Sequence, residues 1–172
     1  AVGLAAAAVS GLRQLPEGVT VTFFDVGQGD AIHIRDGSVD VIVDGGPSSN
    51  FAGQLRRDLP STDRTLELVV ATHPDADHIT GLASLVAAFD VRQVLEPDVP
   101  SKTKTAQRWH EAVARAGLSV IRPSIGQRFS LPHGTLTVLW PRDGLNRPAT
   151  NDHSIVLRLD VGADCVLLTG DA

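Results

Sequence analysis

Six consecutive residues, His73-Pro74-Asp75-Ala76-Asp77-His78, constrain this chain more than any other segment. They place two imidazoles and two carboxylates directly after an apolar stretch, 66–72, which predicts a buried strand. Apolar residues then recur at helical spacing over 79–89. A turn between a strand and a helix holds its side chains at the edge of a sheet, so these four side chains can point into one cavity.

This spacing favours a site for two metal ions. Residues two apart at the extended end of a strand share a face, so His73 and Asp75 can bind one ion. Asp77 and His78, on the turn into the helix, can reach a second. Two ions about 3.5–4 Å apart would clamp a bridging hydroxide and polarise a scissile bond. The alternative is a solvated acidic turn that caps the helix, but four ligand side chains packed so densely are not typical of a cap.

The rest of the chain is rich in strands with helices between them. Three alternating runs separated by turn residues, 19–24, 31–34 and 39–43, predict an antiparallel meander. Helices are predicted around 51–59 and over 103–116, and further strands at 93–95, 118–121, 136–140, 155–161 and 165–168. Strands in two groups with helices interspersed fit two sheets packed face to face with helices outside.

Length and charge limit the function classes. The 172 residues suffice for one domain, expected over 17–172, and are too few for two ordinary ones. The net charge of −5 argues against a basic domain that holds nucleic acid by its own surface charge. A nucleic-acid substrate stays open, because bound divalent ions would reverse the field locally.

Cys165 and both tryptophans, Trp109 and Trp140, are predicted to be core residues. Three histidines that stand alone in the sequence are expected to be structural or surface residues: His33, His110 and His133.

The first nine residues are almost entirely apolar. A membrane-spanning helix needs roughly 20 apolar residues, so this stretch is too short to span. A signal peptide would carry basic residues ahead of the apolar part, and none stand there. We expect residues 1–16 to be a linker remnant that holds the end of a membrane helix, with a short alanine-rich surface helix as the alternative.

The His-x-Asp-x-Asp-His run resembles the His-x-His-x-Asp-His signature of the metallo-β-lactamase superfamily, with Asp75 in place of the middle histidine. Further segments are similar to one branch of it, the C-terminal domain of ComEC-type DNA-uptake proteins of natural competence. They are Asp-Val-Gly-Gln-Gly-Asp-Ala at 25–31, Val-Asp-Gly-Gly at 43–46, Asn-Asp-His-Ser-Ile-Val-Leu at 151–157 and Leu-Leu-Thr-Gly-Asp at 167–171. Order and spacing agree from about residue 19 to the end.

The resemblance implies an α/β fold, an αββα sandwich of two mixed sheets flanked by helices. It also implies that the domain is C-terminally incomplete here, because the superfamily places a further metal-binding histidine beyond the Gly-Asp turn. His73 and Asp75 would hold the first metal, and Asp77 and His78 the second. Asp171 would bridge the two ions, and Asp77 would also orient the attacking hydroxide as the catalytic residue. Asn151 and Asp152 are expected to be ligands or to support the ligands, and four more residues are expected to shape the floor of the site: Asp25, Gln28, Asp30 and Asp44.

The carboxylate at Asp75 bears on the choice of metal. Exchanging a neutral imidazole for a carboxylate hardens the site and adds negative charge. We therefore expect two divalent ions, with Mn²⁺ favoured and Zn²⁺ or Mg²⁺ still open. No nicotinamide or flavin cofactor is expected, and the oligomeric state is left open.

The leading hypothesis is a metal-dependent phosphodiesterase that degrades DNA during competence-linked uptake. The resemblance implies a parent protein in the cell membrane, with this domain on the extracytoplasmic side and a membrane channel domain of the same chain as its partner. Two alternatives remain: a small-molecule metallo-hydrolase of the lactamase or thioesterase type, and a non-catalytic domain that docks DNA or a partner.

Overall fold

The computed structural model describes residues 18–60, 62–141 and 151–172. The predicted meander is confirmed: β1 (Val19–Phe23), β2 (Ala31–Asp36) and β3 (Val39–Gly45) pair as antiparallel neighbours. The expected linker over 1–16 lies outside the described residues. The predicted boundary at residue 17 therefore stays a prediction.

Parallel strands and helices alternate after the meander. The elements are α1 (Phe51–Asp58), β4 (Thr65–Leu66), β5 (Leu68–Val70), α2 (Ala76–Ala88), β6 (Asp90–Val91), β7 (Val94–Leu95), α3 (Lys104–Arg115) and β8 (Val120–Ile121). Strands β3, β5, β7 and β8 are parallel and complete a six-stranded sheet in the order β1-β2-β3-β5-β7-β8. The single strand predicted over 66–72 is in fact two, because β4 pairs with β6 in a separate ribbon.

The last part of the described chain forms a second sheet. Its strands are β9 (Arg128–Ser130), β10 (Gly134–Trp140), β11 (Val156–Val161) and β12 (Asp164–Leu168), and a short 3-10 helix, η1 (Asn151–His153), precedes β11. The four strands are antiparallel in the order β12-β11-β10-β9. Sequence reasoning predicted three of them and missed β9.

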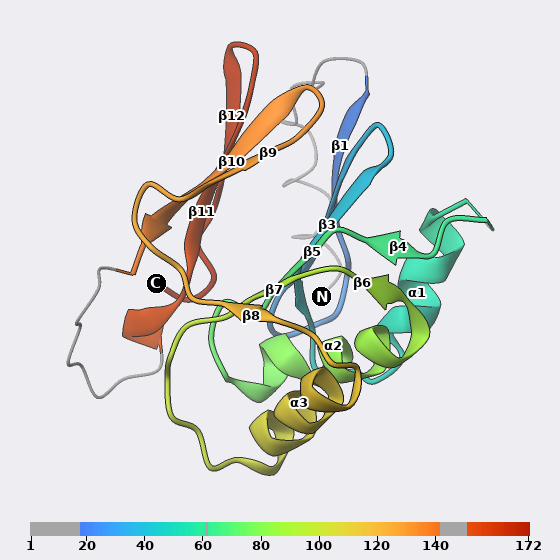
Figure 1. The fold of residues 1–172 in the computed structure, drawn as a ribbon, viewed down its shortest axis with the longest axis vertical. Coiled ribbons are helices and arrows are strands. Elements are labelled where there is room, and N and C mark those ends of the chain that lie inside the picture. The colour runs from blue at the N-terminus through green and yellow to red at the C-terminus, as the bar shows by residue number, and fades with distance from the viewer. Residues whose placement is uncertain (1–17, 61, 142–150) are drawn as a thin grey trace, which may run out of the picture.

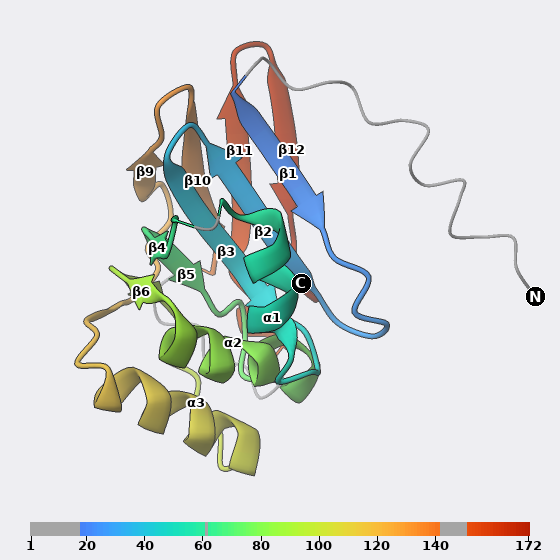
Figure 2. The same ribbon diagram turned by 90° about the vertical axis from the view of Figure 1, so that its right-hand side faces the viewer.

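The layers are four-stranded sheet, six-stranded sheet and helices (Figures 1 and 2). One core fills the space between the six-stranded sheet and the helices and includes Phe51, Leu82 and Trp109. The other lies between the two sheets and includes Ile34 and Leu136. The two-sheet α/β fold is therefore confirmed, with α1, α2 and α3 all on one side. Within the described residues, no helix is long and apolar enough to cross a lipid bilayer.

Two of the predicted core residues differ from expectation. Trp109 is buried as predicted, but Trp140 is only partly buried. Cys165 was expected in the core and is exposed, so that prediction is wrong. The reason is the alternation of β12: Val166 and Leu168 face the core between the sheets, so Cys165 and Leu167 between them face outward.

Candidate metal centre

The site begins at the carboxyl ends of two parallel strands. Val43 of β3 pairs with Val70 of β5, which brings Asp44, the residue after Val43, close to Thr72, two residues after Val70. The backbone N–H of Thr72 donates to Asp44 Oδ1 at 2.9 Å. Asp44 has a φ of 59°, a left-handed conformation that aspartate tolerates better than most residues. The end of β3 thereby turns the Asp44 carboxylate toward the end of β5.

Helix α2 is brought against this corner by a contact between two glycines. A Cβ on Gly81 would lie 2.0 Å from the carbonyl oxygen of Gly45, so no larger residue fits at this crossing. The N–H of Gly81 also donates to the carbonyl oxygen of Gly46 at 3.1 Å. This close approach sets His78 next to Asp44, and His78 Nδ1 lies 2.8 Å from Asp44 Oδ2. Because a carboxylate accepts, the ring Nδ1–H donates.

The Thr72 hydroxyl orients the second histidine. Its oxygen is 2.6 Å from Asp44 Oδ2 and 2.9 Å from His73 Nδ1. A hydroxyl has one proton, and it is donated to the carboxylate, so the hydroxyl oxygen accepts from His73 Nδ1–H. Asp44 and Thr72 thus fix the protons of both imidazoles at Nδ1. Both histidines then present Nε2 to the cavity, which is the arrangement in which a carboxylate-supported histidine binds a metal.

The two Nε2 atoms are buried and have no hydrogen-bond partner among the described residues. His73 Nε2 lies 3.8 Å from Asp75 Oδ2 and 3.8 Å from Asp171 Oδ2. His78 Nε2 lies 3.3 Å from Asp171 Oδ1, and the two ring centroids are 4.2 Å apart. Buried polar atoms without a partner are costly, whereas two imidazole nitrogens facing two carboxylates suit a divalent cation. The residues present therefore fit a metal site.

Asp77, the remaining ligand candidate of the motif, is hydrogen-bonded to a residue of another loop. Gln28 Nε2 donates to Asp77 Oδ2 at 2.8 Å. The loop of Gln28, between β1 and β2, rests on the first turn of α2, because a Cβ on Gly29 would lie 1.9 Å from the Asp77 carbonyl oxygen. The hydrogen bond from Gln28 commits one carboxylate oxygen of Asp77 to the loop. The structure does not record a short contact of Asp77 with His73.

The structure brings some of the other predicted site residues together and leaves the rest at the edge of the site. His73, Asp75, His78 and Asp171 converge, as the distances above show. Asn151 reaches Asp171 Oδ2 at only 3.5 Å, and Asp152 accepts a hydrogen bond from Trp140 Nε1 through its backbone oxygen at 2.8 Å. Asp25 is exposed and Asp30 lies partly buried beside the cavity.

Asp44 is closer to the centre than expected. One carboxylate oxygen of Asp44 and one ring nitrogen from each of His73 and His78 lie within 4.8 Å of one another. Thr72 was missed. A hydroxyl residue directly before the first histidine at the end of a buried strand is the signal that could have found it.

Comparison with known proteins decides the family. The profile described as "Metallo-beta-lactamase superfamily" matches residues 24–172. The chain belongs to this superfamily. "Recombination protein 2" of Haemophilus influenzae is 28% identical over 156 residues, covering 88% of this chain and 18% of its own length. The chain thus spans less than a fifth of that curated relative.

Solved structures of the superfamily share the fold at low identity. The metallo-β-lactamase fold protein YhfI from Bacillus subtilis is 18% identical, with a TM-score of 0.58 over 91% of this chain and 61% of its own. A Cronobacter sakazakii metallo-β-lactamase with a HARLDQ motif is 16% identical, with a TM-score of 0.58 over 87% of this chain and 60% of its own. These likenesses concern the fold alone.

The pKa values of the two histidines of the motif shift in opposite directions. Burial, together with the charge of His78, lowers the pKa of His73. Burial alone would lower the pKa of His78 too, but its hydrogen bond to Asp44 and the nearby carboxylates raise the pKa to about 9. Burial and the Asp44 charge raise the pKa of Asp30. For Asp77, burial opposes ionisation, but the Gln28 hydrogen bond, a backbone hydrogen bond and the charges of His78 and His73 together lower the pKa. Without a bound metal ion, His78 is therefore the imidazole that the carboxylates of the site hold most strongly as a cation.

Proposed function

We propose that this domain is a metal-dependent phosphodiesterase that acts on DNA during competence-linked DNA uptake. The observation that carries the proposal is the pair of buried Nε2 atoms of His73 and His78, which face the Asp75 and Asp171 carboxylates without a hydrogen-bond partner among the described residues. A binding site of nitrogen and carboxylate oxygen atoms at the edge of a sheet suits divalent ions of the superfamily's kind.

The contacts of His73, His78 and Asp171 support the proposed ligand roles. His73, Asp75 and Asp171 would share one ion, and His78, Asp171 and Asp77 a second, with Asp44 and Thr72 holding the imidazoles. Divalent ions bound here would supply charge stabilisation for the attacking and leaving oxygens of a phosphodiester. The carboxylate at Asp75 hardens the site, so Mn²⁺ is the preferred ion, with Zn²⁺ or Mg²⁺ as the other choices.

Asp77 is the proposed catalytic residue. Gln28 holds its Oδ2, which leaves Oδ1 without a hydrogen bond to Gln28, and the lowered pKa keeps the group ionised near neutral pH. An ionised carboxylate in this position would accept a proton from an attacking water and orient it. Asn151 and Asp152 would support Asp171 at the rim, and Asp25 and Asp30 would shape the floor.

DNA as the substrate is supported by the relative. The Haemophilus influenzae protein is a recombination protein by its printed name, and the matching region is a small part of a much longer chain. The Asp-Val-Gly-Gln-Gly-Asp run and Asp75 are the residues that resemble the ComEC-type branch. We therefore propose a parent protein in the cell membrane, with this domain on its extracytoplasmic side and a channel domain of the same chain as its partner.

Nuclease assays with metal replacement test this function. The purified protein is incubated with single- and double-stranded DNA and with Mn²⁺, Mg²⁺ or Zn²⁺, and Asp77→Ala is compared with Asp58→Ala, which changes an exposed aspartate at the end of α1. We expect cleavage with Mn²⁺ that is lost in Asp77→Ala and kept in Asp58→Ala. No DNA cleavage with any metal would overturn the proposal.

Two outcomes would favour the alternatives. Hydrolysis of a β-lactam or a thioester with Zn²⁺, without cleavage of DNA, would identify a small-molecule hydrolase. Nuclease activity that Asp77→Ala leaves unchanged would show that the motif is not the catalytic centre, and DNA binding without cleavage would point to a docking domain.

A further inference from the structure

The carboxyl edge of the parallel strands continues beyond the metal motif. Asp44 lies at the carboxyl end of β3 and His73 beyond that of β5, and in the same way Glu96 follows β7 and Arg122 follows β8. In open α/β sheets ligands bind outside the carboxyl ends of the strands. Neighbouring strands are about 4.8 Å apart, so Arg122 stands two strand spacings, roughly 10 Å, along the edge from His73.

A hollow of about 350 Å³ opens at this end of the edge. It is lined by the loop from Glu96 to Lys102, by His110 of α3 and by Arg122. Glu96, Pro97 and Val99 also line a small cavity that His73 and Pro74 border, so the two spaces share a wall. The hollow is therefore the neighbouring space on the β7–β8 side of the metal motif.

Arg122 is held in place with part of its guanidinium free to bind. Its Nη1 donates to the carbonyl oxygens of Glu96 at 3.1 Å and Pro97 at 3.0 Å. Its Nη2 lies 3.5 Å from Asp98 Oδ1, but the Asp98 side chain is 88% exposed and the Arg122 side chain 52% exposed. An exposed ion pair of this kind is worth little, so a phosphate can replace Asp98 at small cost. A guanidinium whose position is fixed suits two-pronged binding of phosphate.

The other charges of the hollow are a partnered carboxylate and a lysine. Glu96 Oε2 accepts from Trp109 Nε1 at 3.1 Å, and Glu96 Oε1 lies 2.6 Å from His110 Nε2. Glu96 Oε1 also lies 3.9 Å from Arg122 Nη1, so the negative charge of Glu96 is shared between α3 and one end of the guanidinium. Lys102 is exposed and lines the same hollow. Arg122 and Lys102 are the groups left to meet an anion.

We propose that this hollow is a subsite for a backbone phosphate of a nucleic-acid strand, next to the phosphodiester that is cleaved. Arg122 is its main contact, and Lys102 adds a second positive charge at the rim. The subsite rests on the proposed function, because the strand that it holds is the substrate of the metal centre. Such a subsite would let a domain with a net charge of −5 bind a phosphate at one place without a broad basic surface.

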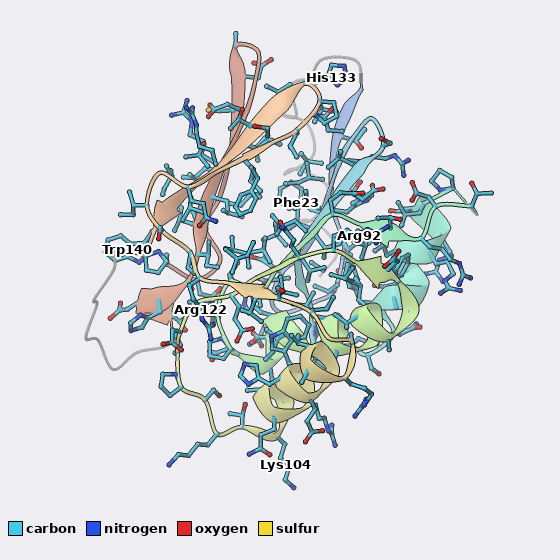
Figure 3. The ribbon with its side chains drawn as sticks, viewed as in Figure 1. Phe23, Arg92, Lys104, Arg122, His133 and Trp140 are labelled. Carbon is cyan, nitrogen blue, oxygen red and sulfur yellow. The ribbon has the colours of Figure 1, made fainter. Side chains whose placement is uncertain are left out.

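Binding in the absence of metal tests the subsite separately from cleavage. Anisotropy of a fluorescent single-stranded oligonucleotide is measured in EDTA over a series of salt concentrations. Arg122→Gln removes the charge and keeps an amide donor on a shorter side chain, and Arg122→Lys keeps the charge and removes the paired donors of the guanidinium. Arg92→Ala is the matched control, since Arg92 is also exposed and paired with one aspartate but lies at the opposite, amino end of β7, far from Arg122 in Figure 3.

We expect Arg122→Gln to weaken oligonucleotide binding roughly five- to tenfold and to reduce the slope of log K against log salt by about 0.7. Arg122→Lys should keep the slope and lose part of the affinity, and Arg92→Ala should bind like the wild type. Inorganic phosphate should compete only weakly, because one phosphate lacks the rest of the strand. A competition as strong as that of the oligonucleotide would identify a free-phosphate site and overturn the proposal.

The failures of the two proposals are distinguishable. Oligonucleotide binding that depends on Arg122, without cleavage under any metal, would overturn the nuclease and support the subsite. Cleavage with wild-type binding by Arg122→Gln would overturn the subsite and leave the nuclease. Equal losses in Arg92→Ala and Arg122→Gln, or no measurable binding by the wild type, would overturn the subsite too.

Discussion

Gln28 donates a 2.8 Å hydrogen bond to Asp77, and this bond joins two motifs that are 49 residues apart in the sequence. The loop between β1 and β2 thereby holds a carboxylate of the first turn of α2. The resemblance placed both motifs at one site but predicted no contact between Gln28 and Asp77. Their contact explains why a glutamine stands between two glycines beside the site.

Loss of the Gln28 amide should weaken metal binding without unfolding the protein. In Gln28→Ala the Asp77 carboxylate is free to rotate, so we expect an affinity for Mn²⁺ roughly tenfold lower by calorimetry. The melting temperature of the metal-free protein should stay the same, because Gln28 is exposed. Gln93→Ala, an exposed glutamine at the amino end of β7, is the control. Equal Mn²⁺ affinity in Gln28→Ala and Gln93→Ala would show that the bond does not position Asp77.

The two glycines beside Gln28 should differ sharply in their tolerance of alanine. Gly27 and Gly29 have φ values of 82° and 85°, so alanine is strained at either position, by about 1–2 kcal/mol. At Gly27 a Cβ would meet nothing within 4 Å, whereas at Gly29 it would lie 1.9 Å from the Asp77 carbonyl oxygen. Gly29→Ala should therefore lose a further 1–3 kcal/mol of unfolding free energy in urea titrations. Similar unfolding free energies for the two variants would contradict the close approach of this loop to α2.

The metal motif could be found from sequence because its members are local. His73 to His78 lie in one strand-turn-helix segment, and a short apolar strand followed by ligand residues is visible without a structure. The partners of the motif are not local. Asp44 meets Thr72 only through the parallel pairing of β3 with β5. β5 is apolar throughout and β3 is buried along almost its whole length, so neither strand shows an alternation of buried and exposed residues that would reveal their register.

Three histidines that looked isolated in the sequence illustrate the same limit. Each lies beside a carboxylate: His33 beside Asp40 at 2.7 Å, His110 beside Glu96 at 2.6 Å and His133 beside Asp36 at 2.6 Å. The last pair spans 97 residues and links the turn between β9 and β10 to the end of β2. Such partners follow from how the sheets pack. The sequence therefore predicted structural or surface roles for these histidines but could not identify their carboxylate partners.

Two threonine-to-valine variants test what the Thr72 hydroxyl contributes to stability and metal binding. Thr72→Val removes the proton that Asp44 accepts and the oxygen that His73 needs, so we expect a loss of about 1–3 kcal/mol in unfolding free energy. The affinity for Mn²⁺ should also fall roughly 10- to 100-fold. Thr137 of β10 is the matched control, because its hydroxyl is buried and has no hydrogen-bond partner among the described residues. Thr137→Val should be neutral or stabilising, and a cost as large as that of Thr72→Val would refute the role of the hydroxyl network.

The His78–Asp44 pair should make the metal-free protein more stable at low pH than at high pH. The pKa of His78 is about 9 in the folded protein against 6.5 unfolded. A group whose pKa rises on folding stabilises the fold fully below its unfolded pKa, and this stabilisation is lost as the pH rises through its folded pKa. The window therefore runs from about pH 6.5 to pH 9, and the change is on the order of 3 kcal/mol. His73 has the opposite sign, because its pKa is lowered, so total stability alone does not isolate His78.

The comparison that isolates it is wild type against His78→Gln. Urea unfolding is measured in EDTA at pH 6, 7.5 and 9.5, and the difference in unfolding free energy between the two proteins should shrink as the pH rises. Thr80→Ala, a change of a hydroxyl on the same helix that does not titrate, should differ from the wild type by a constant amount. A His78→Gln difference that stays constant from pH 6 to pH 9.5 would mean that Asp44 does not hold His78 as a cation. Asp44 would then act on the imidazole only as a hydrogen-bond acceptor.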